Sequence, residues 1–270
     1  MALFLSSCSS IREDAAKIAA HAGLDRTIFQ TKSFSLVGFM RGHADVLMVF
    51  IEGDGLAWVN RTTLSADPTP YHPVGLALAA SEPGPAVAYL ARPCQYVEGV
   101  EARGCDPRYW SSHRFSPEVI SATTQAVNDA QRQAGATKIV LVGYSGGGVL
   151  ATLVASGRSD VISLITIAAP LDITAWTNHH DITPLSGSVN PATLADRLAK
   201  IPQIHFFGGN DRVVPLEIGE NFLKLEGKNS AGRIVIIADN DHACCWAQQW
   251  HAMRQYIQFP SPGTMRKTPH

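Results

Sequence analysis

The sequence predicts an α/β protein in which a mostly parallel central sheet is covered by helices on both faces. Continuous apolar runs of strand length, such as residues 45–52 and 138–143, alternate along the chain with segments of helical pattern. A strand buried on both faces is expected to be apolar throughout, and strand–helix alternation specifies parallel pairing. The chain has 270 residues, of which 46% are hydrophobic, and this suits one domain with a sizeable core.

The expected elements follow one another along most of the chain. Strands are expected over residues 31–41, 45–52, 86–91, 138–143, 161–169, 203–208 and 233–238. Helices are expected over residues 12–23, 116–135, 147–156, 191–199, 215–224 and 243–257. The start of one helix is marked by Ser116, Pro117 and Glu118, a capping serine followed by a first-turn proline and an acidic residue.

A single domain is expected over residues 12–258. The polar stretch 172–190 is long for a connection and is expected to belong to a short cap loop at about 172–200, which would leave the pocket fairly open. Residues 1–11 are interpreted as a signal-like or disordered N-terminus, and residues 259–270 as a flexible tail.

The segment Gly143-Tyr144-Ser145-Gly146-Gly147 carries the strongest chemical signal. It has Gly-x-Ser-x-Gly spacing, directly follows an apolar strand and directly precedes a helix of small residues. This context is typical of a nucleophilic serine on a sharp turn, where glycines avoid clashes and a helix N-terminus offers N–H groups. Ser145 is therefore predicted to be the nucleophile, and the alternative is a glycine-rich turn with an incidental serine.

A serine nucleophile needs a base that is oriented by an acid. Asp211 follows the strand expected over 203–208, and His242 follows the strand expected over 233–238, so both fall at the edge of the sheet where Ser145 lies. Asp211 is predicted as the acid and His242 as the base. The rival residues are Asp172 as the acid, with Asp239 and Asp241 less suited, and His179, His180, His205 and His251 as the base.

Two N–H groups are expected to bind the oxyanion. One belongs to Gly146, the residue after the nucleophile, and the other is expected from the Gly53-Asp54-Gly55 loop after the strand over 45–52. Asp54 N–H is preferred over the N–H groups of Gly53 and Gly55. The alternative is that this segment is an ordinary tight turn.

Several residues are expected to contact substrate around this site. They are Gly53, Gly55, Tyr144, Trp176 and His179. For Trp176 and His179, the alternative is a packed surface loop. No metal site is expected, because adjacent histidines such as His179 and His180 are poor ligands for one ion, and no cofactor is expected.

The cysteines and the N-terminus point to an exported protein. Cys94 and Cys105 flank a polar segment that a disulfide could close, with free thiols as the alternative. Leu5-Ser6-Ser7-Cys8 resembles a bacterial lipobox, so Cys8 is expected to carry a lipid anchor, although no positively charged segment precedes it. The expected location is the cell envelope, periplasmic or membrane-anchored, and the alternative is the cytoplasm.

These motifs, in this order, resemble those of the α/β-hydrolase superfamily. The IEGDG loop, the ARPCQYV segment, the GYSGG turn, the GGNDRVVP segment and the H-x-CCW ending make residues 5–258 similar to bacterial α/β-hydrolase lipoproteins. The resemblance implies the α/β-hydrolase fold and a triad of Ser145, Asp211 and His242.

The expected activity is cleavage of a small-molecule ester, as in a carboxylesterase. The alternatives are an interfacial lipase, a thioesterase and a binding protein without catalysis. The net charge of −1 excludes a basic field for nucleic acid.

Overall fold

The structure is a computed structural model that describes residues 5–228 and 230–257, with side chains from residue 11 onward. Within these residues, eight strands form one sheet in the order β1-β2-β4-β3-β5-β6-β7-β8. The strands are β1 (Asp25–Gln30), β2 (Ser35–Arg41), β3 (Val46–Ile51), β4 (Val87–Leu90), β5 (Lys138–Tyr144), β6 (Val161–Ile167), β7 (Gln203–Gly208) and β8 (Gly232–Ile237). β2 is antiparallel to both of its neighbours, and the strands from β4 to β8 are all parallel.

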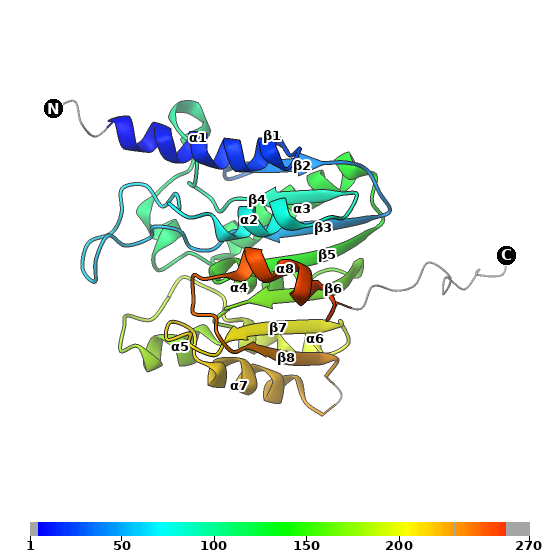
Figure 1. Cartoon of the computed structure of the whole chain (residues 1–270). Helices are drawn as coiled ribbons and strands as arrows, with labels where there is room; N and C mark the ends of the chain where they lie inside the picture. Colours follow the sequence, from blue (N-terminus) through cyan, green and yellow to red (C-terminus); the bar gives the residue numbers. More distant parts are fainter. Residues whose placement is uncertain (1–4, 229, 258–270) are drawn as a thin grey trace.

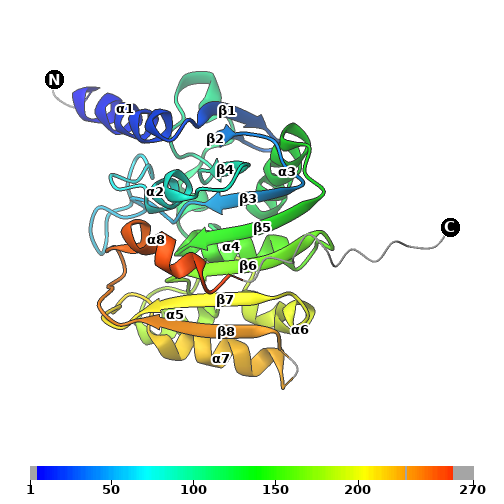
Figure 2. The same cartoon turned by 45° about the vertical axis from the view of Figure 1, so that its right-hand side comes forward.

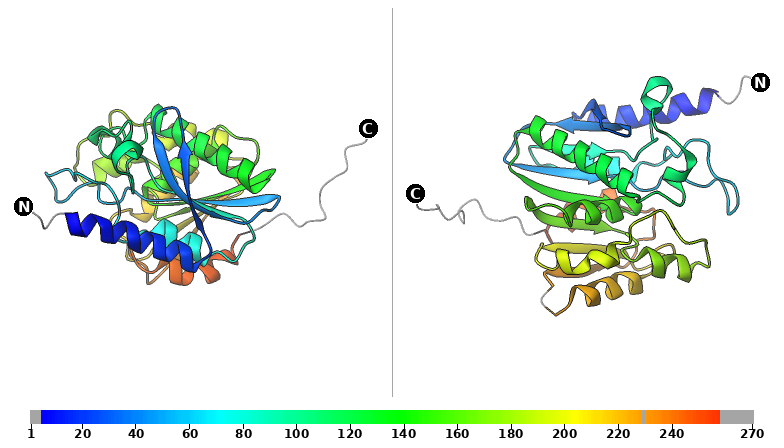
Figure 3. Two further views of the ribbon diagram at one scale, coloured as in Figure 1. Left: turned by 90° about the horizontal axis from the view of Figure 1, so that it is seen from above. Right: turned by 180° about the vertical axis from the view of Figure 1, so that it is seen from behind.

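Helices cover both faces of this sheet, as predicted (Figures 1 and 3). One face carries α1 (Leu5–His21), α2 (Val74–Ser81) and α8 (Trp246–Arg254). The other face carries α3 (Pro117–Ala134), α4 (Gly146–Ala155), α6 (Ala195–Leu198) and α7 (Leu216–Glu226). Two clusters of buried apolar side chains fill the layers between the sheet and these helices. The core therefore lies on both sides of the parallel strands, and central strands such as β3 and β4 are apolar along their whole length for that reason.

The parallel strands all end at one edge of the sheet. The loop 52–73, the helix α5 (Ile173–His179) and the segment 238–245 extend from this edge (Figures 1 and 2). Short 3₁₀ helices complete the chain, at Gly99–Ala102, Pro107–Trp110 and Pro191–Leu194. Residues that follow β3, β5, β7 and β8 are thus gathered at this edge, where open α/β sheets bind ligands.

The helix α3 forms where the sequence predicted it. Ser116 Oγ accepts a hydrogen bond from Val119 N–H, and Pro117 occupies the first turn, where no N–H is needed. The helix ends at Gly135, whose φ of 63° is left-handed.

Four elements differ from the sequence expectation. β1 was not expected, because it is an edge strand with a single buried residue and no apolar run. α2 lies in a segment for which no element was expected, and α5 lies inside the polar stretch 172–190. α1 begins at Leu5 rather than at residue 12. All four are short or partly polar segments whose structure depends on contacts made elsewhere in the fold.

Cys8 lies within the backbone of α1, but its side chain is outside the described residues, as is the tail 259–270. Cys94 and Cys105 form the expected disulfide. None of the described helices is both long enough and apolar enough to cross a membrane. Across the described residues, no group of three or more His, Cys, Asp or Glu side chains is placed to hold a metal ion.

Candidate active site

Ser145 occupies the sharp turn between β5 and α4. Its φ of 50° and ψ of −124° are strained for a residue with a side chain. A Cβ at Gly143 would lie 2.3 Å from the carbonyl oxygen of Gly147, so this tight turn needs a glycine at that position. The turn leaves the Ser145 side chain half-buried at the edge where the parallel strands end.

Three side chains form a continuous hydrogen-bonded chain at this turn. His242 Nε2 lies 3.0 Å from Ser145 Oγ, and His242 Nδ1 lies 2.9 Å from Asp211 Oδ2. With its Nδ1–H donated to the carboxylate, the imidazole presents the Nε2 lone pair to the serine hydroxyl. This arrangement is able to remove the Ser145 proton as the oxygen attacks an electrophile.

Asp211 is itself held by its own loop. Its Oδ1 accepts hydrogen bonds from the N–H groups of Val213 at 2.8 Å and Val214 at 2.9 Å. Its side chain is fully buried, whereas that of His242 is 19% exposed. The two backbone N–H groups therefore fix the Asp211 carboxylate, and of the two side chains only the imidazole is accessible to small molecules and water.

Two aromatic side chains hold the main chain of His242. The Tyr144 hydroxyl and the Trp246 Nε1–H both donate to the His242 carbonyl oxygen, each at 2.9 Å. Burial raises the pKa of Tyr144, so the hydroxyl keeps its proton and remains a donor. Tyr144 was expected to contact substrate; in the structure its hydroxyl donates to the main chain of His242.

The rival residues have other partners. Asp172 caps α5 by accepting from the N–H groups of Thr174 and Ala175. His205 is buried inside β7 against the Thr166 hydroxyl, and burial lowers its pKa to about 3. His180 Nε2 lies 2.7 Å from the Val213 carbonyl oxygen. Ser145, Asp211 and His242 are thus brought together, and Asp172 and these two histidines are not part of that chain.

The helix α5, which was predicted to form a pocket wall, is hydrogen-bonded to the loop that contains Asp211. Trp176 Nε1–H donates to the same Val213 carbonyl oxygen at 2.7 Å, and its ring packs edge-on to His180. His179 is exposed and packs edge-on against His180. Trp176 therefore links α5 to the loop that carries Asp211.

The Gly53-Asp54-Gly55 loop lies against Ser145. A Cβ built on Gly53 would be 3.4 Å from Ser145 Cβ, and one built on Gly146 would be 2.1 Å from Asp54 Oδ1. Gly53 N–H donates to Glu52 Oε1 at 2.9 Å, so it is already engaged. Among the described residues, none accepts a hydrogen bond from Asp54 N–H.

The buried carboxylate of Glu52 holds the start of this loop. Besides Gly53, its buried carboxylate accepts hydrogen bonds from the N–H groups of Gly75 and Leu76 and from the Tyr89 hydroxyl. Burial raises the pKa of Glu52, and the four hydrogen bonds oppose that rise. The carboxylate joins the end of β3 to the start of α2.

The Asp54 side chain is held from the other side by two buried arginines. Arg92 Nη1 lies 2.8 Å from Asp54 Oδ1, and Arg114 Nη1 lies 2.6 Å from Asp54 Oδ2. Burial alone would raise the pKa of Asp54, but the charges of Arg114 and Arg92 outweigh it and hold that pKa below its usual value.

The sequence reasoning missed the residues that support the loop. They are Glu52, Arg92, Gln95 and Arg114; Trp246, which holds the His242 main chain, was missed as well. A signal was present for some of them, because Glu52 ends an apolar strand run, and Arg92 and Gln95 flank Cys94 in a segment of low polarity. A charged or amide residue in such a setting must find buried partners.

Comparisons with known proteins agree with this geometry at the level of the fold. No protein-family model matches the chain, and no curated protein sequence matches it. Est1E from Butyrivibrio proteoclasticus is similar in structure, with a TM-score of 0.59 at 14% identity over 86% of this chain and 97% of that chain. The Pyrococcus furiosus esterase Pf2001 has a TM-score of 0.58 at 13% identity over 86% and 88%.

A Pyrococcus horikoshii acylaminoacyl peptidase has a TM-score of 0.60 at 14% identity. The match covers 86% of this chain but only 40% of the peptidase. The similarity of these structures, the strand order and the strand–turn–helix at Ser145 lead to one conclusion: this chain has the α/β-hydrolase fold.

Proposed function

We propose that this protein is a serine hydrolase that cleaves a small-molecule ester through Ser145, His242 and Asp211. The observation that carries the proposal is the unbroken chain from Ser145 Oγ to His242 Nε2 and from His242 Nδ1 to Asp211 Oδ2. It lies at the end of the parallel strands, on a strained turn that presents the serine.

In the first half-reaction, His242 Nε2 takes the Ser145 proton as Oγ attacks the ester carbonyl carbon. The N–H groups of Gly146 and Asp54 bind the oxygen that becomes negative, and Asp211 stabilises the charged imidazolium. The carbon–oxygen bond to the alcohol then breaks, the imidazolium gives its proton to the leaving alcohol, and the acyl group stays on Ser145.

In the second half-reaction, water replaces the alcohol. His242 takes a proton from the water as its oxygen attacks the acyl carbon. The bond to Ser145 Oγ breaks, and the proton returns to Oγ. The products are a carboxylic acid and the free enzyme, and no cofactor is needed for any of these steps.

The experiment is turnover of a p-nitrophenyl short-chain ester by the wild type and by Ser145→Ala. We expect a loss on the order of 10⁴-fold or more, because the attacking oxygen is removed while the fold is kept. Labelling of the wild type, but not of the variant, by a fluorophosphonate probe provides the matched control. Near wild-type turnover by Ser145→Ala would rule out the proposal.

Two observations favour testing other acyl substrates beside short esters. Similar structures include acylaminoacyl peptidases, which favours including amides. The loop 52–73 exposes Trp58, Val59 and Tyr71, as a long-chain lipase would at an interface. A panel of amides, thioesters and esters of increasing chain length separates these classes. Faster turnover of long chains above their solubility limit would identify a lipase.

A further inference from the structure

Gln95 connects the oxyanion loop to the segment after β4. Its side chain is completely buried. Nε2 donates to the Gly53 carbonyl oxygen at 3.0 Å and to the Pro68 carbonyl oxygen at 3.4 Å, while Oε1 accepts from Arg92 N–H at 3.0 Å. Both neighbours of Nε2 are acceptors and the neighbour of Oε1 is a donor. The amide can therefore make all three hydrogen bonds in only one orientation.

The Gly53 carbonyl belongs to the same peptide group as Asp54 N–H. In a planar trans peptide these two bonds point in opposite directions. Holding the Gly53 carbonyl on Gln95 therefore directs Asp54 N–H away from Gln95. Gly53 N–H is engaged by Glu52 at 2.9 Å, so neither end of Gly53 is free to rotate.

We infer that Gln95 is a positioning residue of the oxyanion hole, and that it orients the Gly53–Asp54 peptide so that Asp54 N–H meets the reacting oxygen. This inference rests on the proposed function. The Asp54 side chain supplies a second anchor, because Arg92 and Arg114 each hold one of its carboxylate oxygens. Arg92 serves both anchors, since its main chain binds Gln95 and its guanidinium binds Asp54.

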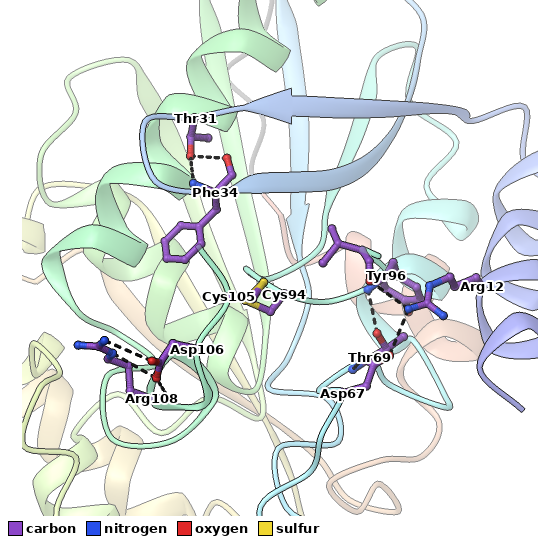
Figure 4. Close-up of a disulfide and its surroundings, with 11 residues drawn as sticks. Arg12, Thr31, Phe34, Asp67, Thr69, Cys94, Tyr96, Cys105, Asp106 and Arg108 are labelled. Atoms are coloured by element: carbon purple, nitrogen blue, oxygen red, sulfur yellow. Dashed lines mark hydrogen bonds and ion pairs between the residues drawn. A yellow bond between two sulfur atoms is a disulfide. The ribbon is translucent and has the colours of Figure 1, made fainter. Parts of the chain in front are cut away.

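The backbone around Gln95 is strained and held on both sides. Cys94 and Tyr96 have φ values of 72° and 60°, which residues with side chains rarely adopt. Figure 4 shows the disulfide from Cys94 to Cys105 on one side and Tyr96 beside Thr69 on the other, where Tyr96 N–H donates to Thr69 Oγ1 at 2.8 Å. Such strain persists only where the surroundings impose it, and it is concentrated at functional sites.

Gly55 makes room for this contact. Its φ is +64°, and a Cβ there would lie 2.7 Å from Gln95 Nε2 and 2.1 Å from the Pro68 carbonyl oxygen. The sequence suggested that Gly55 lets substrate approach. In the structure, the groups that approach Gly55 are Gln95 and Pro68.

The test uses Gln95→Glu and Gln95→Met. Neither an ionised carboxylate nor a thioether can donate to the Gly53 carbonyl, and both side chains are close to glutamine in length. We expect kcat to fall by about 10²-fold, the usual effect of losing one oxyanion donor, while KM changes little. Gln133→Glu, on the exposed side of α3, is the matched control and is expected to keep wild-type turnover.

Two readouts separate positioning from a purely structural role. A trifluoromethyl ketone forms a hemiketal with the serine, and its oxyanion needs the same donors. Its inhibition constant should therefore rise by the factor by which kcat/KM falls, measured at a temperature where each variant is fully folded. In addition, the carboxyl group introduced by Gln95→Glu could donate to the Gly53 carbonyl once it is protonated, so the ratio of Gln95→Glu to wild-type kcat/KM should rise from pH 8 to pH 5.5. The ratio for Gln95→Met should stay flat.

The outcomes distinguish this inference from the proposed function. If Ser145→Ala abolishes turnover while both Gln95 variants keep wild-type kcat and inhibitor affinity, the role of Gln95 is wrong and the serine hydrolase stands. If Ser145→Ala keeps its turnover, both are overturned. If Gln95→Glu does not fold, Gln95→Met gives the same reading through kcat and the trifluoromethyl ketone.

Discussion

The two sides of the site are built in different ways. On one side, Ser145, Asp211 and His242 each come from a short loop after a parallel strand, and they meet through two hydrogen bonds. On the other side, the Gly53–Asp54 peptide is held by buried polar side chains from three separate parts of the chain. The groups proposed to react each lie in a loop directly after a parallel strand, whereas the groups that hold the peptide include Glu52 beside it and side chains 38 to 60 residues away.

Burial follows the same division. Ser145 is half-buried and the His242 side chain is 19% exposed, so reactants can reach both. Glu52, Arg92 and Gln95 are almost completely buried and all have hydrogen-bond partners. A buried polar group that loses its partner costs about 1–3 kcal/mol, which makes such a network resistant to rearrangement. We therefore expect the loop side to be the rigid half of the site.

The largest effect on turnover should come from the triad side. Asp211→Asn keeps the size of the acid but favours the wrong imidazole tautomer, so we expect kcat to fall by about 10⁴-fold. Asp172→Asn is the matched control, because an asparagine can still cap α5, and it should keep wild-type kcat. Steady-state kinetics on one ester measure both. If Asp172→Asn lowered kcat more than Asp211→Asn, the acid would be Asp172 and not Asp211.

The same contrast explains what the sequence could predict. The strand–turn–helix around Ser145, and an acid and a histidine after later strands, are local patterns, and the structure brings these three residues together. Gln95 and Arg114 lie in no such motif, so nothing near them in the sequence points to their partners, which lie 42 and 60 residues away. Without a motif to mark them, contacts of this kind depend on the completed fold, so a single sequence does not reveal them.

The elements follow the same rule. Buried strands such as β5 have apolar sequences and were predicted within a residue or so. β1 gains its structure from pairing with β2, and α2 from packing beside α8, so neither has a strong pattern of its own. Tyr144 was expected to contact substrate, and its neighbours in the sequence could not show that its hydroxyl donates to the His242 carbonyl oxygen.

An intermediate effect on turnover is expected from removing the disulfide between Cys94 and Cys105, which lies beside Gln95. Replacing both Cys94 and Cys105 by serine should lower the free energy of unfolding by about 3 kcal/mol, because the closed loop restricts the unfolded chain. Turnover should fall only several-fold at a temperature where the variant is folded, since Gln95 keeps its own hydrogen bonds. Denaturant unfolding and kinetics at that temperature measure the two effects. A loss of turnover as large as that of Gln95→Glu would show that the disulfide, not the amide, aims the peptide.

The smallest effect on turnover should come from His205, in the strand that leads to Asp211. Burial lowers its pKa to about 3, below the usual value near 6.5, so between these pH values the unfolded chain binds a proton that the folded chain does not. The stability contributed by His205 is therefore present above pH 6.5 and is lost towards pH 3, by at most about 1.4 kcal/mol per pH unit.

His205→Asn can keep the hydrogen bond to Thr166 but does not titrate. Its free energy of unfolding should fall less steeply with acid than that of the wild type, while its turnover at neutral pH stays within about twofold, because no reacting group touches His205. Urea unfolding at several pH values between 6.5 and 4 measures the slopes. Equal slopes for the two proteins would mean that His205 accepts a proton in the folded chain. A large loss of turnover in His205→Asn would mean that the position of the Asp211 loop depends on the packing of β7.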